Sequence, residues 1–158
     1  MKIRKLAIIL VVVAILTMSL TSCKMEHEEV LDTLPDYFAS FEYLDPNGFR
    51  DYTYYCKYYF KDISADTFDD NRFFSKVEEG DLEEILSFIN EYEDTTKSFE
   101  EVSRIYDFDK SILKPGDFFY IKTLEGKMAG ERDYEKFDYY SVFYFDLENQ
   151  ILYYFHND

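Results

Sequence analysis

The 158-residue chain has no tryptophan, two cysteines, two histidines, three prolines and five glycines. So few glycines and prolines exclude a low-complexity linker or a collagen-like repeat, and no Gly-rich loop is present to cradle a phosphate. The absence of tryptophan argues against an aromatic platform for carbohydrate. His27 and His156 lie near opposite ends of the chain, a poor arrangement for a metal site or for nucleophile–histidine catalysis. We therefore expect no metal and no cofactor.

Basic charge is also scarce, because 17 Lys and Arg face 33 Asp and Glu, giving a formal charge of −16. An acidic field of this size repels nucleic acid and anionic lipid headgroups, so it excludes nucleic-acid binding and membrane adsorption through a basic patch. The chain still has ample apolar surface to offset its conformational entropy, since it holds 16 Tyr and 16 Phe. Its length suits a single domain.

The first 23 residues have the layout of a secretory signal peptide. The basic segment "MKIRK" is followed by "LAIILVVVAIL", an apolar run of eleven residues, and by "TMSLTSC", which leads through small residues to Cys23. A membrane-spanning helix needs about 20 predominantly apolar residues. The alternatives to lipidated export are an uncleaved anchor and a soluble secreted protein in which Cys23 merely lies near the cleavage site.

The segment "LTSC", which ends at Cys23, resembles the lipobox of bacterial prolipoproteins. The resemblance implies a diacylglycerol on the Cys23 sulfur, cleavage between Ser22 and Cys23, and Cys23 as the mature N-terminus. The thiolate is a good nucleophile for accepting the lipid, and two or more acyl chains anchor a protein stably. We therefore expect a lipid-anchored protein at the cell membrane that faces outside the cytoplasm, on the periplasmic or outer-membrane side if the envelope is Gram-negative.

This interpretation divides the chain into a cleaved signal peptide (1–22), a lipidated tether (23–35) and a single domain (36–158). With Cys23 lipidated, Cys56 has no disulfide partner in the mature chain. Because it alternates with aromatic residues, we expect Cys56 to be a small buried hydrophobe.

The domain pattern predicts an α+β fold. Alternating residues over 52–60 indicate a strand, and apolar residues at spacings of three and four predict a helix over about 81–95, capped by Asp81. Three strand-like runs follow Pro115 and indicate an antiparallel meander. The expected order is β-α-β-β-β, an antiparallel sheet of about four strands with one main helix on one face.

Two segments invite a catalytic or metal-binding interpretation. Asp107-Phe108-Asp109 resembles the nucleophile motif of haloacid-dehalogenase-type phosphatases, but Ser111 replaces the usual Thr or Val and no alternating strands and helices follow. We interpret this segment as a turn whose side chains satisfy backbone amides. The acidic loop 62–71 lacks the spacing and glycine of an EF-hand. We therefore assign no catalytic residue.

The predicted C-terminal hairpin has aromatic residues on both faces, whereas a sheet covered by one helix needs only one apolar face for its core. We take Tyr140, Val142 and Tyr144 as the candidate partner surface, because Tyr is enriched in interfaces. The alternative is that Tyr and Phe line both faces simply as strand formers. The favoured function is a non-catalytic binding module with an envelope protein partner. The alternatives are a small envelope hydrolase using acidic residues and an inhibitor or immunity-type lipoprotein.

Overall fold

A computed structural model describes residues 26–44, 53–97, 100–124, 126–127 and 133–158. The chain forms two compact units, Met1–Thr33 and Leu34–Asp158. In the described part of the first unit, α2 (Glu26–Leu31) is a helix within the segment expected to be a tether. Its glutamates at the first turn favour this conformation, because they lie at the positive end of the helix dipole. None of the helices in these residue ranges is both long and apolar enough to cross a membrane.

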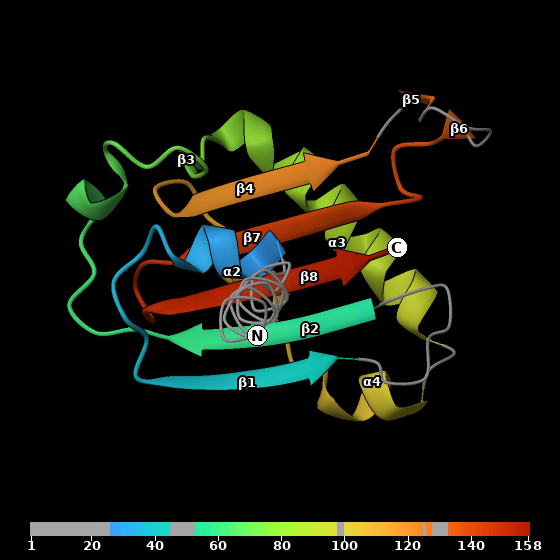
Figure 1. Ribbon diagram of the computed structural model, residues 1–158, viewed down its shortest axis with the longest axis horizontal. Helices are drawn as coiled ribbons and strands as arrows, with labels where there is room; N and C mark the ends of the chain where they lie inside the picture. The colour runs from blue at the N-terminus through green and yellow to red at the C-terminus, as the bar shows by residue number, and fades with distance from the viewer. Residues whose placement is uncertain (1–25, 45–52, 98–99, 125, 128–132) are drawn as a thin grey trace, which may run out of the picture. The chain divides into compact units, whose positions relative to one another are not determined.

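The second unit contains a six-stranded antiparallel sheet with the order β1-β2-β8-β7-β4-β3 (Figure 1). The strands are β1 (Ala39–Leu44), β2 (Thr53–Tyr59), β3 (Ser75–Lys76), β4 (Phe118–Thr123), β7 (Tyr140–Asp146) and β8 (Ile151–Asn157). A separate two-stranded ladder pairs β5 (Gly126–Lys127) with β6 (Asp133–Tyr134). The α+β class is confirmed, but the main sheet has six strands rather than about four, because β1 and β3 extend its two edges.

The main helix is α3 (Leu82–Thr96), close to the predicted range, and it lies against one face of the sheet (Figure 1). Asp81 does not cap it through its side chain. The Asp81 carboxylate instead accepts a hydrogen bond from the Glu78 backbone N–H at 2.8 Å. This bond stabilises the short 3-10 helix η2 (Glu79–Asp81), which leads directly into α3.

The remaining helical segments of the second unit are short. They are α4 (Glu100–Ile105) and the 3-10 helices η1 (Ala65–Phe68) and η3 (Lys110–Ile112).

The core lies between α3 and the sheet. The side chains of Phe88 and Tyr140 lie with ring centroids 5.2 Å apart, and those of Tyr92 and Phe155 are 5.4 Å apart. Aromatic pairs at these separations add to the stabilisation from apolar burial. The cluster comprises Tyr55, Val77, Ile85, Phe88, Ile89, Tyr92, Phe108, Tyr140, Val142, Tyr144 and Phe155.

Candidate functional site

The hairpin residues chosen as a partner surface lie in the core instead. Tyr140, Val142 and Tyr144 are each fully buried, and all three belong to the cluster beneath α3. Alternation along β7 correctly placed them on one face, but it could not tell which face the helix covers. The prediction that they form a partner surface was therefore wrong. Ser22 and Cys23, the predicted cleavage and lipidation positions, lie outside the described residues.

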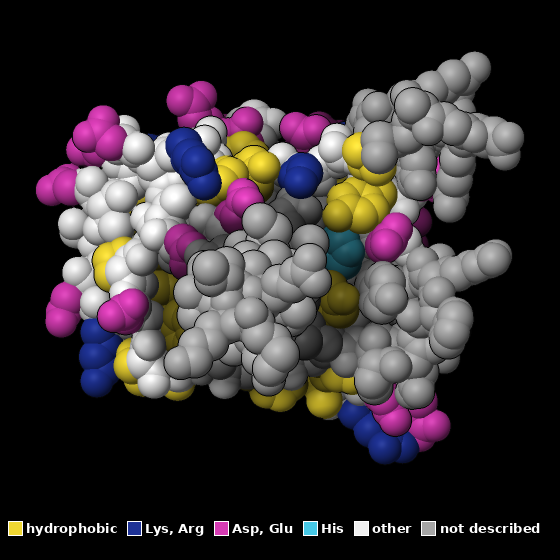
Figure 2. All heavy atoms as spheres, in the orientation of Figure 1, with side chains coloured by type: hydrophobic (Ala, Val, Ile, Leu, Met, Phe, Trp, Pro, Cys, Tyr) yellow, Lys and Arg dark blue, Asp and Glu magenta, His cyan; other side chains and the backbone are white. Residues whose placement is uncertain are grey.

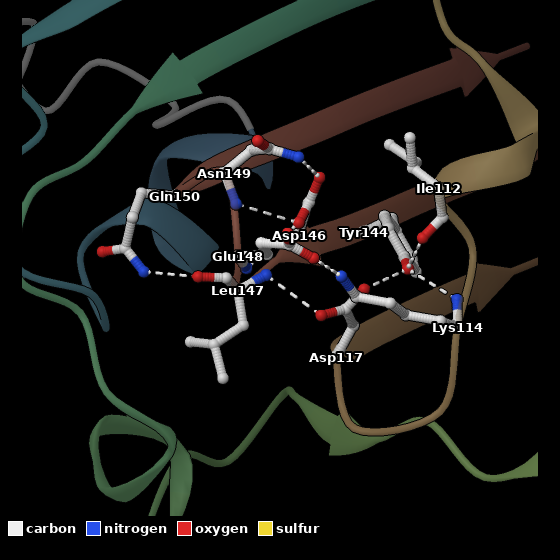
Figure 3. A network of polar contacts seen from close by, with 9 residues as sticks. All are labelled: Ile112, Lys114, Asp117, Tyr144, Asp146, Leu147, Glu148, Asn149 and Gln150. Carbon is white, nitrogen blue, oxygen red and sulfur yellow. Dashed lines mark hydrogen bonds and ion pairs between the residues drawn. The ribbon is translucent and has the colours of Figure 1, made fainter.

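Two buried carboxylates organise the end of the sheet where β7 turns into β8 (Figure 3). The Asp117 carboxylate accepts hydrogen bonds from the Leu147 N–H, at 3.1 Å, and from the Tyr144 hydroxyl. The Asp146 carboxylate accepts the N–H groups of Glu148 and Asn149, both at 3.1 Å, and the Asn149 side-chain amide at 2.7 Å. Together they satisfy three backbone N–H groups of the turn, which would otherwise need water as an acceptor.

We call this network, in which Asp117 and Asp146 bind the β7–β8 turn, the turn clamp, and its electrostatics are those of a buried structural group. Burial raises the pKa of Asp117, an effect that the Tyr144 hydroxyl and the Leu147 N–H oppose. Burial, followed by the hydrogen bond to Asp117, also raises the pKa of Tyr144. Both carboxylates are no more than 1% exposed, and their oxygens are occupied by donors of the protein itself. The pair therefore holds the turn rather than presenting an acid and a base to a substrate.

Gln150 extends the clamp to the loop after β2. Its backbone has a positive φ of 59°, and its side chain bonds to the backbone of Ile63. The side-chain oxygen Oε1 of Gln150 accepts the Ile63 N–H at 2.7 Å, and its side-chain Nε2 donates to the backbone carbonyls of Ile63 and Leu147 at 2.9 and 2.6 Å. The Gln150 side chain thus pairs with both the N–H and the C=O of Ile63, as the backbone of a neighbouring strand would.

The phosphatase-like segment is also structural. The Asp107 carboxylate accepts hydrogen bonds from the Tyr55 hydroxyl at 2.7 Å and from Lys57 Nζ at 2.6 Å. Burial alone would raise the pKa of Asp107, but these two donors lower it below its ordinary value. Phe108 is part of the core, and the Asp109 side chain accepts the Ser111 N–H at 2.9 Å. This arrangement agrees with the interpretation of the segment as a side-chain-stabilised turn.

Two pockets of the second unit combine aromatic with charged side chains. One, of about 290 Å³, lies beside β4 and includes Phe88, Ile121 and the ion-paired Glu84 and Lys136, whose side-chain atoms are 3.2 Å apart. Each pocket has one carboxylate among its described lining residues, whereas most glycoside hydrolases use a pair of carboxyl groups.

The second pocket has the same volume and is lined by Glu93, Thr96, Lys97 and Tyr106. Its carboxylate is already bound, because Glu93 accepts from Tyr106 at 2.9 Å and from Lys110 at 2.6 Å. Within the residues that the structure describes, no three His, Cys, Asp or Glu side chains gather as a metal site. Cys56 is buried, and burial raises its pKa to about 12, so its thiol is not reactive.

The exposed large apolar side chains of the described residues gather at one edge of the sheet. Tyr37, Phe38 and Phe41 are 41%, 60% and 37% exposed, and they lie on β1 or directly before it. Figure 2 shows hydrophobic side chains along the lower edge of the view, where β1 lies in Figure 1. We call this region, residues 37–43, the β1 edge. Two lysines accompany its aromatic rings, because Lys61 Nζ lies 4.6 Å from the Phe38 ring centroid and Lys57 Nζ lies 5.2 Å from that of Phe41.

Among the described residues, some backbone hydrogen-bonding groups of the β1 edge have no strand to pair with. Successive residues of an antiparallel strand bond alternately to the two sides. The Phe60 N–H donates to the Gln150 carbonyl at 2.9 Å, so the even-numbered residues of β2 bond toward β8 and the odd-numbered ones toward β1. The β1 partners of those odd-numbered residues are Ala39, Phe41 and Tyr43. The N–H and C=O groups of Ser40 and Glu42 therefore point away from the sheet.

The unit that carries this edge is strongly negative as a whole. Leu34–Asp158 contains 13 basic and 29 acidic side chains, a formal charge of −16 (13 − 29). At least six of the cations are already paired with carboxylates, since ion pairs form at Lys57, Lys97, Arg104, Lys110, Lys114 and Lys136. Asp36 and Glu42 are exposed beside the aromatic residues. The net field of the unit therefore attracts a cationic partner and repels an anionic one.

Comparison with known proteins found no match to a family model, to a curated protein or to a solved structure.

Proposed function

We propose that the protein is a lipid-anchored extracytoplasmic binding protein without catalytic activity, and that it engages an envelope protein partner through the β1 edge. The observation that carries the binding role is the exposure of Tyr37, Phe38 and Phe41 at the outer edge of the main sheet, where no described strand pairs with the free side of β1. Monomeric proteins seldom leave such residues exposed together unless they form an interaction site. The proposal keeps the binding role expected from the sequence but moves the surface from the hairpin to β1.

The anchoring part of the proposal is supported by the sequence "LTSC" before the polar chain and by the acidic charge. With a formal charge of −16 on the second unit, a lipid on Cys23 supplies the attachment that a basic patch cannot. The non-catalytic part is supported by the buried carboxylates, which bind backbone donors, and by the two pockets described above, each with a single carboxylate among its described lining residues.

Lipidation is tested by replacing Cys23 with serine in the full chain. We expect Cys23→Ser to abolish metabolic labelling by a radioactive fatty acid and to leave an unprocessed or released protein. The matched control is Cys56→Ser, which leaves the lipobox intact and should retain the label. Undiminished labelling of the Cys23→Ser variant would disprove the anchor.

The binding role is tested by placing a photo-crosslinking amino acid at Phe38 or Phe41 in living cells. We expect both positions to capture the same envelope protein, identified by mass spectrometry. An exposed position away from the edge, Asp70, serves as the control and should not capture it. Capture of different proteins from each position, or equal capture from Asp70, would contradict the proposed surface.

A further inference from the structure

We infer that the β1 edge binds an extended cationic segment of its partner, which adds to the sheet as a seventh strand with alternating apolar and basic residues. This inference rests on the proposed function and specifies the chemistry of the partner. In strand addition, main-chain hydrogen bonds provide affinity and alternate side chains provide specificity. The β1 edge offers both.

The main-chain component comes from Ser40 and Glu42. Their N–H and C=O groups point outward, so an added strand can pair with both residues without disturbing the bonds between β1 and β2. No other strand of the described residues occupies this side of β1. The pairing therefore costs no internal hydrogen bond.

The side-chain component follows from the alternation of β1. Phe41 and Tyr43 lie on the face that α3 covers, as the 6.5 Å separation between the rings of Phe41 and Tyr55 shows. Ser40 and Glu42 lie on the opposite face. An incoming residue opposite Phe41 occupies a non-hydrogen-bonded position, where cross-strand side chains are closest, so an apolar residue fits there. Its neighbour lies opposite Glu42, where a lysine or arginine is favoured.

Charge decides between the two occupants that an open edge admits. A second copy of the chain would bring another unit with a formal charge of −16 against the first. A cationic segment gains from the same field, both in its rate of association and in the local contact with Glu42. The acidic surface therefore selects a foreign strand over self-pairing.

The test uses the full chain in an uncharged detergent and two synthetic peptides with blocked ends. The first, Lys-Val-Lys-Val-Lys-Val-Lys, alternates basic and apolar residues. The second, Lys-Lys-Lys-Lys-Val-Val-Val, has the same composition and charge in blocks. We expect the alternating peptide to bind at least about tenfold more tightly, measured by fluorescence anisotropy, and to slow amide hydrogen exchange within residues 39–44.

Two variants at one position separate backbone pairing from charge. Ser40→Pro removes an outward N–H and no ladder bond, which edge strands tolerate, whereas Ser40→Ala keeps that N–H. We expect Ser40→Pro to lower affinity for the alternating peptide about tenfold and Ser40→Ala to leave it unchanged. Were Ser40→Pro unfolded by circular dichroism, the exchange protection of residues 39–44 in the unaltered chain would decide.

Three results would overturn the inference. They are equal affinity for the two peptides, absence of protection in residues 39–44, and a dimer of the chain alone that resists dilution and involves β1. The last would identify a second copy as the occupant. If crosslinking from Phe41 captures a protein but the alternating peptide shows no preference, the proposed function stands and strand addition alone is disproved.

Discussion

The clamp of Figure 3 gives a stability prediction whose size can be worked out from its bonds. Asp117→Ala removes the acceptor of the Leu147 N–H, 3.1 Å away, and the acceptor of the Tyr144 hydroxyl. Hydrogen bonds to a charged group contribute about 1.5–3 kcal/mol each. The cost of burying the carboxylate, which raises the pKa of Asp117, offsets part of this. We expect a net loss of about 3 kcal/mol in the free energy of unfolding, or roughly 10 °C in Tm.

The informative control is Asp117→Asn. Its side-chain oxygen can still accept from Leu147, and its amide can donate to the Tyr144 hydroxyl, which then donates to the Ile112 carbonyl at 3.2 Å. We expect Asp117→Asn to cost no more than about 1 kcal/mol. The exposed Asp70→Ala should cost less than about 0.5 kcal/mol. Urea unfolding followed by circular dichroism and tyrosine fluorescence measures all three.

The raised pKa of Asp117 also predicts how the stability difference between wild type and Asp117→Asn changes with pH. Because the pKa of Asp117 is higher in the folded protein, the native state holds the proton more tightly than the unfolded chain does. The stability contributed is fully present below the ordinary Asp pKa of about 3.9 and is lost as the pH rises through the raised value. Wild type should thus gain stability relative to Asp117→Asn as the pH falls from neutral. Equal loss for the Ala and Asn variants, or the opposite pH trend, would refute the clamp.

Three further predictions concern the neighbouring core and surface. Tyr140→Phe removes a buried hydroxyl that has no hydrogen-bond partner among the described residues, so the free energy of unfolding in urea should stay equal or rise by up to about 1 kcal/mol; a clear loss would reveal a missing partner. Val142→Ala should lower the free energy of unfolding by about 2 kcal/mol, because Val142 is buried beneath α3. A loss below about 0.5 kcal/mol would instead indicate that Val142 is exposed. For Asp107, hydrogen bonds from Lys57 and Tyr55 lower the pKa despite burial. The stability advantage of wild type over Asp107→Asn should therefore be present above the ordinary Asp pKa and shrink as the pH falls through the lowered value. Urea unfolding at several pH values measures this difference, and a trend in the other direction would contradict the paired geometry.

Local periodicity predicted the long elements and failed where structure depends on distant partners. α3 was recognised because apolar side chains recur at helical spacing, and Ile85, Phe88, Ile89 and Tyr92 are buried on the side that faces the sheet. The C-terminal strands β4, β7 and β8 form the expected antiparallel meander. β3 has only two residues and forms because it pairs with Phe118 and Phe119, so no local sequence pattern predicts it.

The candidate site was harder to predict than the fold, for a reason that β7 and β1 illustrate. Both strands alternate, and alternation shows which residues share a face but not what covers that face. The sequence of β1 does carry a signal, since Phe41 and Tyr43 alternate with Ser40 and Glu42. Its position at the edge, which leaves Phe41 exposed, depends on pairing with β2 and on the insertion of β8 on the other side of β2.

The two edges of the main sheet are built differently, and the difference supports a function for one of them. Natural sheets avoid unwanted pairing by shortening an edge strand or placing lysine or proline in it. The β3 edge follows this rule, with two residues that include the exposed Lys76. β1 is six residues long, has neither lysine nor proline, and exposes Phe41. Such an edge invites aggregation unless something opposes self-pairing, and the acidic charge of the unit does so while leaving a cationic strand free to bind. The charge and the open edge therefore act together: without the acidic charge the open edge would promote aggregation, and without the open edge the charge would have no strand-binding site to protect.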